Sequence, residues 1–314
     1  MNGLYPLKLS YLAKSTLWGG ERLKNYGKVP SDDNIAETWE LAVRDKENSV
    51  ILNGEAEGKT LKQYLEENGI SFRRFPLLVK FIDAKDDLSV QVHPDDVYAA
   101  KNEKDPGKTE MWVILEAEPG ASLIYGLKDG KTAEDFARAV QSGDYASVLH
   151  QTEVHPGEVW FIPSGMPHAI GKGVLLAEIQ QNSDTTYRVY DYDRRDKNGN
   201  LRELHIQKAK DVVRPFTRAE VESIRFAGGK DTAPRGTVLL ADSAFFKVSL
   251  YPGGEKVDLS PSVFMHLLAV DGKGTLTFGE EKMPLTKGDS VFLPQGVSVS
   301  LEGDVQTLIS EPKR

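Results

Sequence analysis

The chain has 314 residues, no cysteine and a formal net charge of −8 at pH 7. The absence of cysteine excludes disulfides and thiolate chemistry, so histidine, carboxylate, amide or water ligands must hold any metal. The negative charge disfavours a nucleic-acid partner, and no apolar run reaches the roughly 20 residues that span a membrane. The first residues lack the basic and apolar blocks of a signal peptide, and we therefore expect a cytoplasmic protein.

The first half of the chain shows mainly the short apolar and alternating runs that are typical of strands. A short helix is predicted over residues 60–69, followed by a strand over residues 77–82. The run 88–93 alternates strictly, which places Gln91 and His93 on the same face of a strand. Side chains two residues apart on one strand face are well placed to act as neighbouring ligands.

Further along the chain, strands and short helices alternate with Gly and Pro. A helical turn is predicted after Pro94, strands over 111–115 and 158–162, and an amphipathic helix over 132–140. The frequent Gly and Pro punctuation favours a β-barrel or sandwich.

Part of the second half of the chain repeats part of the first. Residues 156–170 and 287–301 share the spacing Gly, five residues, Pro, one residue, Gly. Residues 118–126 and 271–279 align without gaps. We interpret this as one barrel unit used twice, with the 132–140 helix inserted in the first copy.

The two copies differ at the position three residues beyond the second Gly of the shared spacing. The first copy has His168 there and the second has Val299. The pattern that ends at His168 resembles the second cupin motif, in which the His is a metal ligand on the inner face of the barrel. A barrel that keeps its shape but exchanges an inward His for Val has kept its packing and lost a ligand.

These patterns predict a mainly β fold of two cupin-like jelly-roll barrels, with a few short helices inserted in the first. The segment 226–236 is the most linker-like part of the chain. We expect a catalytic cupin domain over residues 1–230 and a degenerate cupin domain without metal ligands over 236–314.

Four side chains form the predicted metal site: Gln91, His93, Glu110 and His168. Glu110 begins the next predicted strand and can bring a carboxylate. Nitrogen and oxygen ligands suit zinc, with manganese or iron as alternatives. Glu110 could instead be a strand-end charge that pairs with Lys108. The other histidines are interpreted as ordinary polar or packing residues: His150, His155, His205 and His266. We interpret the segment around Trp39 as a structural strand.

Several segments together resemble the type I mannose-6-phosphate isomerases, in particular their short bacterial-type subgroup. The resemblance extends over most of the chain, and the segments that carry it are residues 16–20, 76–96, 108–112, 161–169 and 181–189. The resemblance implies an isomerase that interconverts mannose 6-phosphate and fructose 6-phosphate through a cis-enediol, with one Zn²⁺ per chain. It implies that Gln91, His93, Glu110 and His168 are the zinc ligands, although Gln91 could orient substrate instead, and that Arg188 is catalytic.

Lys108 is a candidate for a second cationic contact to the phosphorylated hexose, with a plain surface lysine as the alternative. The sequence does not identify the general base. We expect a monomer or homodimer. Two other functions stay open on the same scaffold: a non-catalytic sugar-binding cupin, and another metal-dependent cupin enzyme such as a dioxygenase, which would normally show three clustered histidines.

Overall fold

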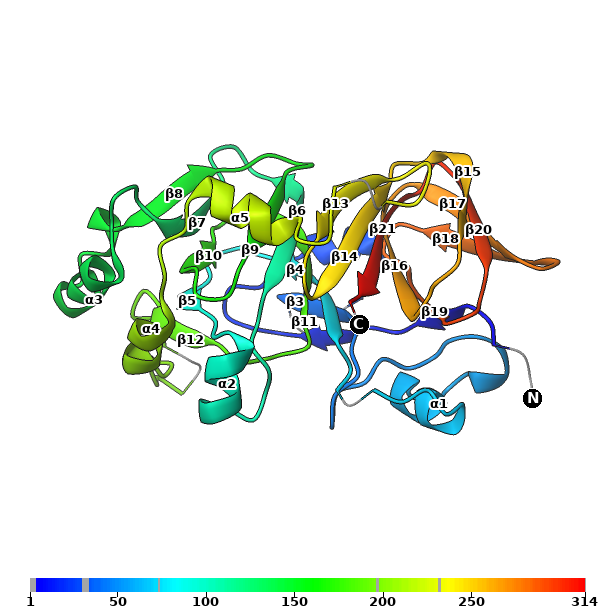
Figure 1. Cartoon of the computed structure of the whole chain (residues 1–314), viewed down its shortest axis with the longest axis horizontal. Coiled ribbons are helices and arrows are strands. Elements are labelled where there is room, and N and C mark those ends of the chain that lie inside the picture. Colours follow the sequence, from blue (N-terminus) through cyan, green and yellow to red (C-terminus); the bar gives the residue numbers. More distant parts are fainter. Residues whose placement is uncertain (1–3, 30–33, 73, 196–197, 231–232, 314) are drawn as a thin grey trace.

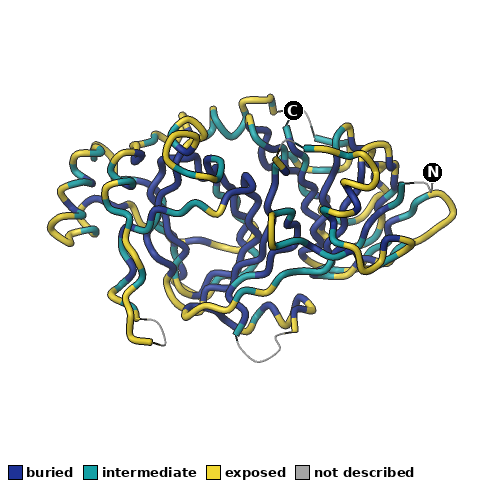
Figure 2. The backbone as a smooth tube through the Cα atoms, turned by 90° about the horizontal axis from the view of Figure 1, so that it is seen from below, coloured by how far each residue is buried: buried dark blue, intermediate teal, exposed yellow. Residues whose placement is uncertain are grey.

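Antiparallel strands are the predominant regular structure, as the sequence predicts, and form two lobes that lie side by side (Figure 1). The computed structural model describes residues 4–29, 34–72, 74–195, 198–230 and 233–313. Buried residues follow the strands of both lobes, and exposed residues gather in the connecting loops (Figure 2). The mainly β prediction is therefore confirmed for the described residues.

Two facing sheets form the first lobe. One has the order β2 (Leu12–Lys14), β3 (Glu37–Leu41), β4 (Leu77–Asp83), β11 (Val174–Gln181), β6 (Glu110–Ala117) and β9 (Val159–Ile162). The other has the order β12 (Tyr187–Tyr190), β5 (Val90–Val92), β10 (His168–Ile170), β7 (Ser122–Leu127) and β8 (Leu149–Glu153).

The second lobe has the same two-sheet plan. One sheet has the order β1 (Leu7–Leu9), β19 (Ser290–Pro294), β16 (Phe264–Asp271), β21 (Gln306–Pro312), β14 (Phe246–Tyr251) and β13 (Val238–Asp242). The other has the order β15 (Gly254–Leu259), β20 (Val299–Gly303), β17 (Lys273–Phe278) and β18 (Glu281–Thr286). The N-terminal strand β1 thus lies in a sheet of the C-terminal lobe, which the sequence did not predict.

The described helices are short and all precede β13: α1 (Leu61–Glu67), α2 (Asp96–Asn102), α3 (Ala133–Ser142), α4 (Ile206–Val212), α5 (Arg218–Arg225) and the 3₁₀ helices η1 (Arg22–Tyr26), η2 (Gly54–Ala56) and η3 (Tyr145–Ser147). The structure confirms the predicted α1, α2 and α3. Two helices were not predicted: α4 begins without a side-chain cap, whereas α5 has a capping box of Thr217 and Glu220 that was an available signal. None of the helices in the described ranges is long and apolar enough to cross a membrane.

The internal repeat is a repeat of structure as well as of sequence. In the first copy Ile170 pairs with Leu123, and in the second copy the corresponding Leu301 pairs with Leu276. The shared glycines also keep one backbone conformation, with φ of +87° at Gly165 and +83° at Gly296, a region open mainly to glycine. The predicted linker 226–236 falls between α5 and β13, and its residues 231–232 lie outside the described part of the chain.

A buried polar contact joins the two lobes. The Lys28 ammonium lies 2.7 Å from the Glu40 carboxylate of the first lobe and donates to the Gly288 carbonyl of the second, also over 2.7 Å. A Cβ at Gly288 would meet the Tyr26 carbonyl oxygen at 1.9 Å, so this close approach requires glycine. The lobes are therefore held by specific contacts rather than by a flexible connection.

Candidate metal centre

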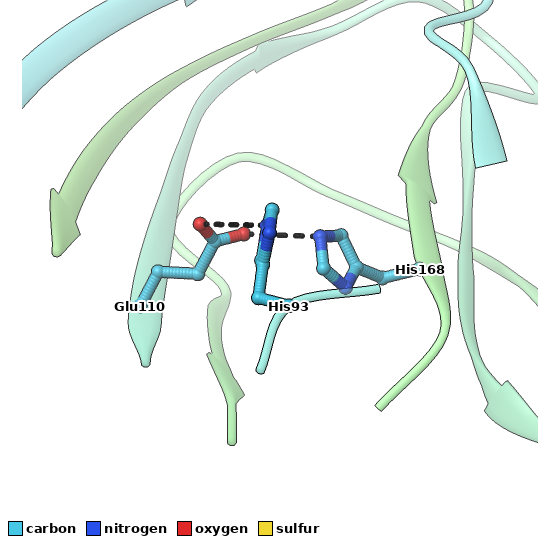
Figure 3. Close-up of side chains that lie close together, drawn as sticks. All are labelled: His93, Glu110 and His168. Carbon is cyan, nitrogen blue, oxygen red and sulfur yellow. Dashed lines mark ion pairs between the residues drawn. The ribbon is translucent and has the colours of Figure 1, made fainter. Parts of the chain in front are cut away.

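Three predicted ligands converge at one end of the first barrel. His93 follows β5 directly, Glu110 begins β6 and His168 begins β10. The Glu110 carboxylate lies 3.6 Å from Nε2 of His93 and 3.3 Å from Nε2 of His168 (Figure 3). One ligand atom from each residue lies within 4.8 Å of the others, a spacing that allows the three to share one ion. The predicted convergence of these side chains is thus observed.

The turn that the sequence repeat identified holds two of these residues together. The Gly165 N–H donates to the His93 carbonyl over 2.8 Å, and His168 follows three residues later at the start of β10. The Pro-x-Gly turn therefore ties the backbone of one histidine to the strand that carries the other.

Both histidines are oriented so that Nε2 faces the cluster. Nδ1 of His93 lies 2.9 Å from the Thr185 carbonyl, and Nδ1 of His168 lies 2.8 Å from the Met166 carbonyl. A carbonyl can only accept, so each Nδ1 carries the proton and each Nε2 presents a lone pair. Neither Nε2, nor Oε1 of Glu110, has a hydrogen-bond partner among the described residues, whereas Oε2 of Glu110 lies 2.9 Å from the Lys108 ammonium. Buried polar atoms without partners are the exception in folded proteins, and a bound cation would satisfy all of these.

Burial sets the protonation of the cluster. It lowers the pKa of His168 to about 4, and burial together with the nearby Lys108 lowers the pKa of His93 well below its ordinary value. Both rings are therefore neutral at pH 7, as metal ligands must be. Burial and the neighbouring Glu178 raise the pKa of Glu110 to about 7, and Lys108 opposes this rise. Two neutral imidazoles and a carboxylate are a donor set that fits zinc.

Charged side chains surround the cluster, and two of them, Lys80 and Glu178, were not predicted to lie there. The Lys108 ammonium is 2.9 Å from Glu110 and 3.9 Å from Glu178, and Lys80 is 3.4 Å from Glu178. Lys108 is only 5% exposed, so its interpretation as a plain surface lysine is wrong. The predicted alternative of a Lys108–Glu110 pair is present, but the same carboxylate also faces both histidines. Lys80 and Glu178 were detectable as charges within otherwise apolar strands.

The two cations fix the charge of the second carboxylate. Burial alone would raise the pKa of Glu178, but Lys108 and Lys80 outweigh it and lower the pKa. Burial disfavours the charge of Lys80, yet Glu37 and Glu178 raise its pKa above the ordinary value. Glu178 is therefore an ionised carboxylate at neutral pH, and the Trp112 indole donates to it over 2.8 Å.

Gln91 and Arg188 share the cluster's side of the barrel wall. In the strand register, Gln91 is the direct neighbour of His168 on one side and of Arg188 on the other. The side chains of directly paired residues on antiparallel strands lie on the same face of the sheet. Ser89 lies on this face as well, because it is two residues before Gln91 on the same strand run. Arg188 Nε donates to the Ser89 hydroxyl over 3.3 Å. Gln91 thus lies between the candidate metal ligands and the predicted catalytic arginine.

The remaining histidines lie apart from the cluster. His150 and His155 are exposed, and buried His266 hydrogen-bonds to Ser290 over 2.8 Å in the second lobe. His205 hydrogen-bonds to the backbone of Arg188. Trp39 is buried in strand β3, as predicted.

Comparison with known proteins agrees with the fold and with the family that the sequence resembles. The family model described as "Phosphomannose isomerase type I, catalytic domain" matches residues 6–118, and "Mannose-6-phosphate isomerase, cupin domain" matches residues 237–312. The chain is 37% identical over 313 residues to mannose-6-phosphate isomerase ManA of Bacillus subtilis (strain 168), covering 97% of this chain and 98% of that protein. It is 36% identical over 315 residues to mannose-6-phosphate isomerase of Streptococcus mutans serotype c, with 97% and 98% covered.

A solved structure shows the same likeness in three dimensions. The crystal structure of the mannose 6-phosphate isomerase from Bacillus subtilis superposes with a TM-score of 0.87 at 34% sequence identity, covering 98% of this chain and 99% of that chain. The predicted cupin-like architecture is therefore confirmed.

Proposed function

This chain belongs to the type I phosphomannose isomerases, and we propose that it interconverts mannose 6-phosphate and fructose 6-phosphate with one Zn²⁺ bound per chain. The family resemblance predicted from the sequence is confirmed by relatives that are 36–37% identical over almost the whole chain. The observation that carries the proposal is the buried cluster of His93, Glu110 and His168, in which both histidine Nε2 atoms lack a hydrogen-bond partner among the described residues.

We assign these three side chains to the zinc site. Their donor set and burial support this assignment. Gln91 is either a fourth ligand or a contact to the sugar, since its strand position adjoins both His168 and Arg188. When bound, zinc would supply Lewis-acid polarisation of the sugar's carbonyl and hydroxyl oxygens.

The reaction moves a proton between C2 and C1 of the sugar through a cis-enediol, and this needs a base that is ionised at neutral pH. Glu178 has the properties required: it is buried, Lys108 and Lys80 lower its pKa against the effect of burial, and it lies beside the cluster. We therefore assign the proton transfer to the Glu178 carboxylate.

The enediol and the phosphate are rich in negative charge and need fixed cations. Arg188 keeps its charge and offers a planar fork of donors, so we assign it to charge stabilisation of the substrate. Lys108, held against Glu110 at 2.9 Å, is the proposed second cationic contact to the substrate.

The division into two domains also stays a proposal. Residues 1–230 would form the catalytic cupin domain and residues 236–314 the degenerate one. The apolar cluster inside the second barrel supports this division, because Met265 and Val299 lie there within a buried hydrophobic core.

The test measures metal content and isomerase activity in one preparation. Purified chain is analysed for zinc and then assayed for conversion of mannose 6-phosphate, with fructose 6-phosphate detected by a coupled enzyme. We expect one zinc per chain, activity that a chelator removes, and recovery on adding Zn²⁺. Sugar binding without turnover would favour a non-catalytic cupin, and activity that depends on iron or copper would favour a different metal enzyme.

A further inference from the structure

Arg188 lies on an edge strand, and a separate segment of the chain covers that edge. Strand β12 is the first in the order of its sheet and pairs only with β5 there. The backbone N–H of Arg188 donates to Nδ1 of His205 over 3.3 Å, and its carbonyl accepts from the backbone N–H of His205 over 2.8 Å. One residue therefore satisfies both backbone groups of Arg188.

The same segment also holds the Arg188 side chain. Its Nη1 donates to the Glu203 carbonyl over 3.0 Å, and its Nε donates to the Ser89 hydroxyl over 3.3 Å. No acceptor among the described residues is hydrogen-bonded to the second terminal nitrogen. The guanidinium is thus hydrogen-bonded through Nε and Nη1, and Nη2 can donate to another acceptor.

The segment is itself anchored to the end of β12. Arg202 donates to both oxygens of Asp191, with Nε at 2.6 Å, and Arg194 donates to the same carboxylate over 2.6 Å. Asp191 is only 5% exposed, so these charge-assisted bonds are shielded from solvent. The Asp191 carboxylate also balances the charge of Arg202, which lies close enough to Arg188 to affect its ionisation.

His205 is the residue whose role is least expected from its position. It precedes helix α4, yet its side chain does not cap that helix. Its Nδ1 instead accepts a hydrogen bond from the backbone N–H of Arg188. The only observed role of this ring nitrogen among the described residues is therefore its bond to the backbone of Arg188.

We propose that the segment Arg202–His205, anchored on Asp191, sets the orientation of Arg188, and that His205 and Arg202 are positioning residues for the isomerase. The expected effect of these residues on isomerase turnover rests on the proposed function. The orientation of Arg188 is a structural matter and can be tested by itself.

The kinetic test is a double-mutant cycle. We expect His205→Ala to lower kcat roughly 10- to 100-fold, the loss typical of a misplaced catalytic group, with zinc content unchanged. In an Arg188→Ala background the same substitution should change kcat less than about twofold, because the group to be positioned is gone. Losses that multiply in the double variant would overturn the proposal.

Conservative variants separate positioning from general stability. His205→Asn places an amide oxygen near the position of Nδ1 and should restore most of the activity, whereas His205→Gln reaches further and should not. His150→Asn, at an exposed histidine far along the chain, is the matched control and should behave as the unchanged protein. If His205→Ala fails to fold, Arg202→Lys keeps the charge but loses the two-pronged bond, and should give the same kinetic pattern.

Crystal structures of the unchanged chain, His205→Ala and His205→Asn give a readout that is independent of activity. Arg188 should adopt one orientation in the first and third proteins and several in His205→Ala. An unchanged Arg188 in His205→Ala would refute the proposal even in an active enzyme. An unchanged chain without isomerase activity would refute the proposed function, while these structures would still decide the positioning role.

Discussion

His168 and Val299 occupy the same position in the two copies of one barrel unit. Each is the first residue of the strand that follows the Pro-x-Gly turn, β10 in the first copy and β20 in the second. The register extends the correspondence to the neighbouring strand, where Glu110 pairs with Ile162 and Met265 pairs with the corresponding Leu293. Two of the three clustered side chains therefore have apolar counterparts in the second barrel.

This relationship predicts what happens when the histidine of the first barrel is replaced by the valine of the second. His168→Val should abolish zinc binding and isomerase activity, because only two of the three clustered ligands remain. Without metal, the free energy of unfolding of the variant should lie within about 2 kcal/mol of that of the unchanged chain. The substitution loses one hydrogen bond but also removes a buried Nε2 that has no partner among the described residues. Metal analysis and urea unfolding after chelation would measure both effects.

A substitution at the corresponding position of the second barrel serves as the control. Val299→Ala should leave zinc content and activity unchanged and lower the free energy of unfolding by about 1–2 kcal/mol through the lost apolar burial. A folded His168→Val protein that retains stoichiometric zinc would contradict the assignment of the site.

Arg188 should matter for turnover and not for metal binding. Arg188→Ala is expected to lower kcat by about 100-fold or more while zinc content stays unchanged, because we assign the side chain to charge stabilisation and not to metal binding. Arg188→Lys should recover little, since one ammonium cannot replace the fork that contacts Ser89 and Glu203. Steady-state kinetics with metal analysis on the same samples would check this, and loss of zinc or an unchanged rate would refute the role.

Breaking the buried pair of Lys28 and Glu40 should destabilise the protein, because one charge would be left buried without its partner. Lys28→Met would leave Glu40 buried without its cation and should lower the free energy of unfolding by about 3–5 kcal/mol. The double variant Lys28→Met/Glu40→Leu removes both charges and should recover most of that loss. Denaturant unfolding measures both, and a double variant as unstable as the single one would contradict the explanation.

His266 should make the protein sensitive to acid. Burial, together with the nearby Lys28, lowers its pKa to about 3, well below the ordinary 6.5. Between these values the unfolded chain binds more protons than the folded one, so stability falls as the pH is lowered through this range. His266→Gln keeps a donor toward Ser290 but cannot titrate. It should reduce the slope of stability against pH by up to about 1.4 kcal/mol per pH unit between about pH 6 and 4.

Unfolding free energies measured across that range would check this prediction. The exposed His150, changed to Gln, is the matched control and should leave the slope unchanged. An unaltered slope in His266→Gln would show that other groups dominate the acid response.

Local sequence patterns were sufficient for much of the fold and for the core of the candidate site. Alternation over residues 88–93, the turn that precedes His168 and the strand that begins at Glu110 pointed to the three side chains that the structure brings together. These signals are local because the strand period and the turn conformation depend on neighbouring residues alone. The spacing of the repeat was also enough to identify Val299 as the apolar counterpart of His168.

Contacts between residues distant in sequence could not be predicted in this way. Strand β1 pairs with β19 near the other end of the chain, Lys80 and Glu178 meet on adjacent strands, and His205 reaches the backbone of Arg188. No local pattern specifies such contacts. The partner of each buried charge is determined only when strands far apart in the chain pack together. The order of amino acids was enough to tell which residues could bind an ion, whereas the folding of the chain decided which charges surround them and what holds Arg188 in place.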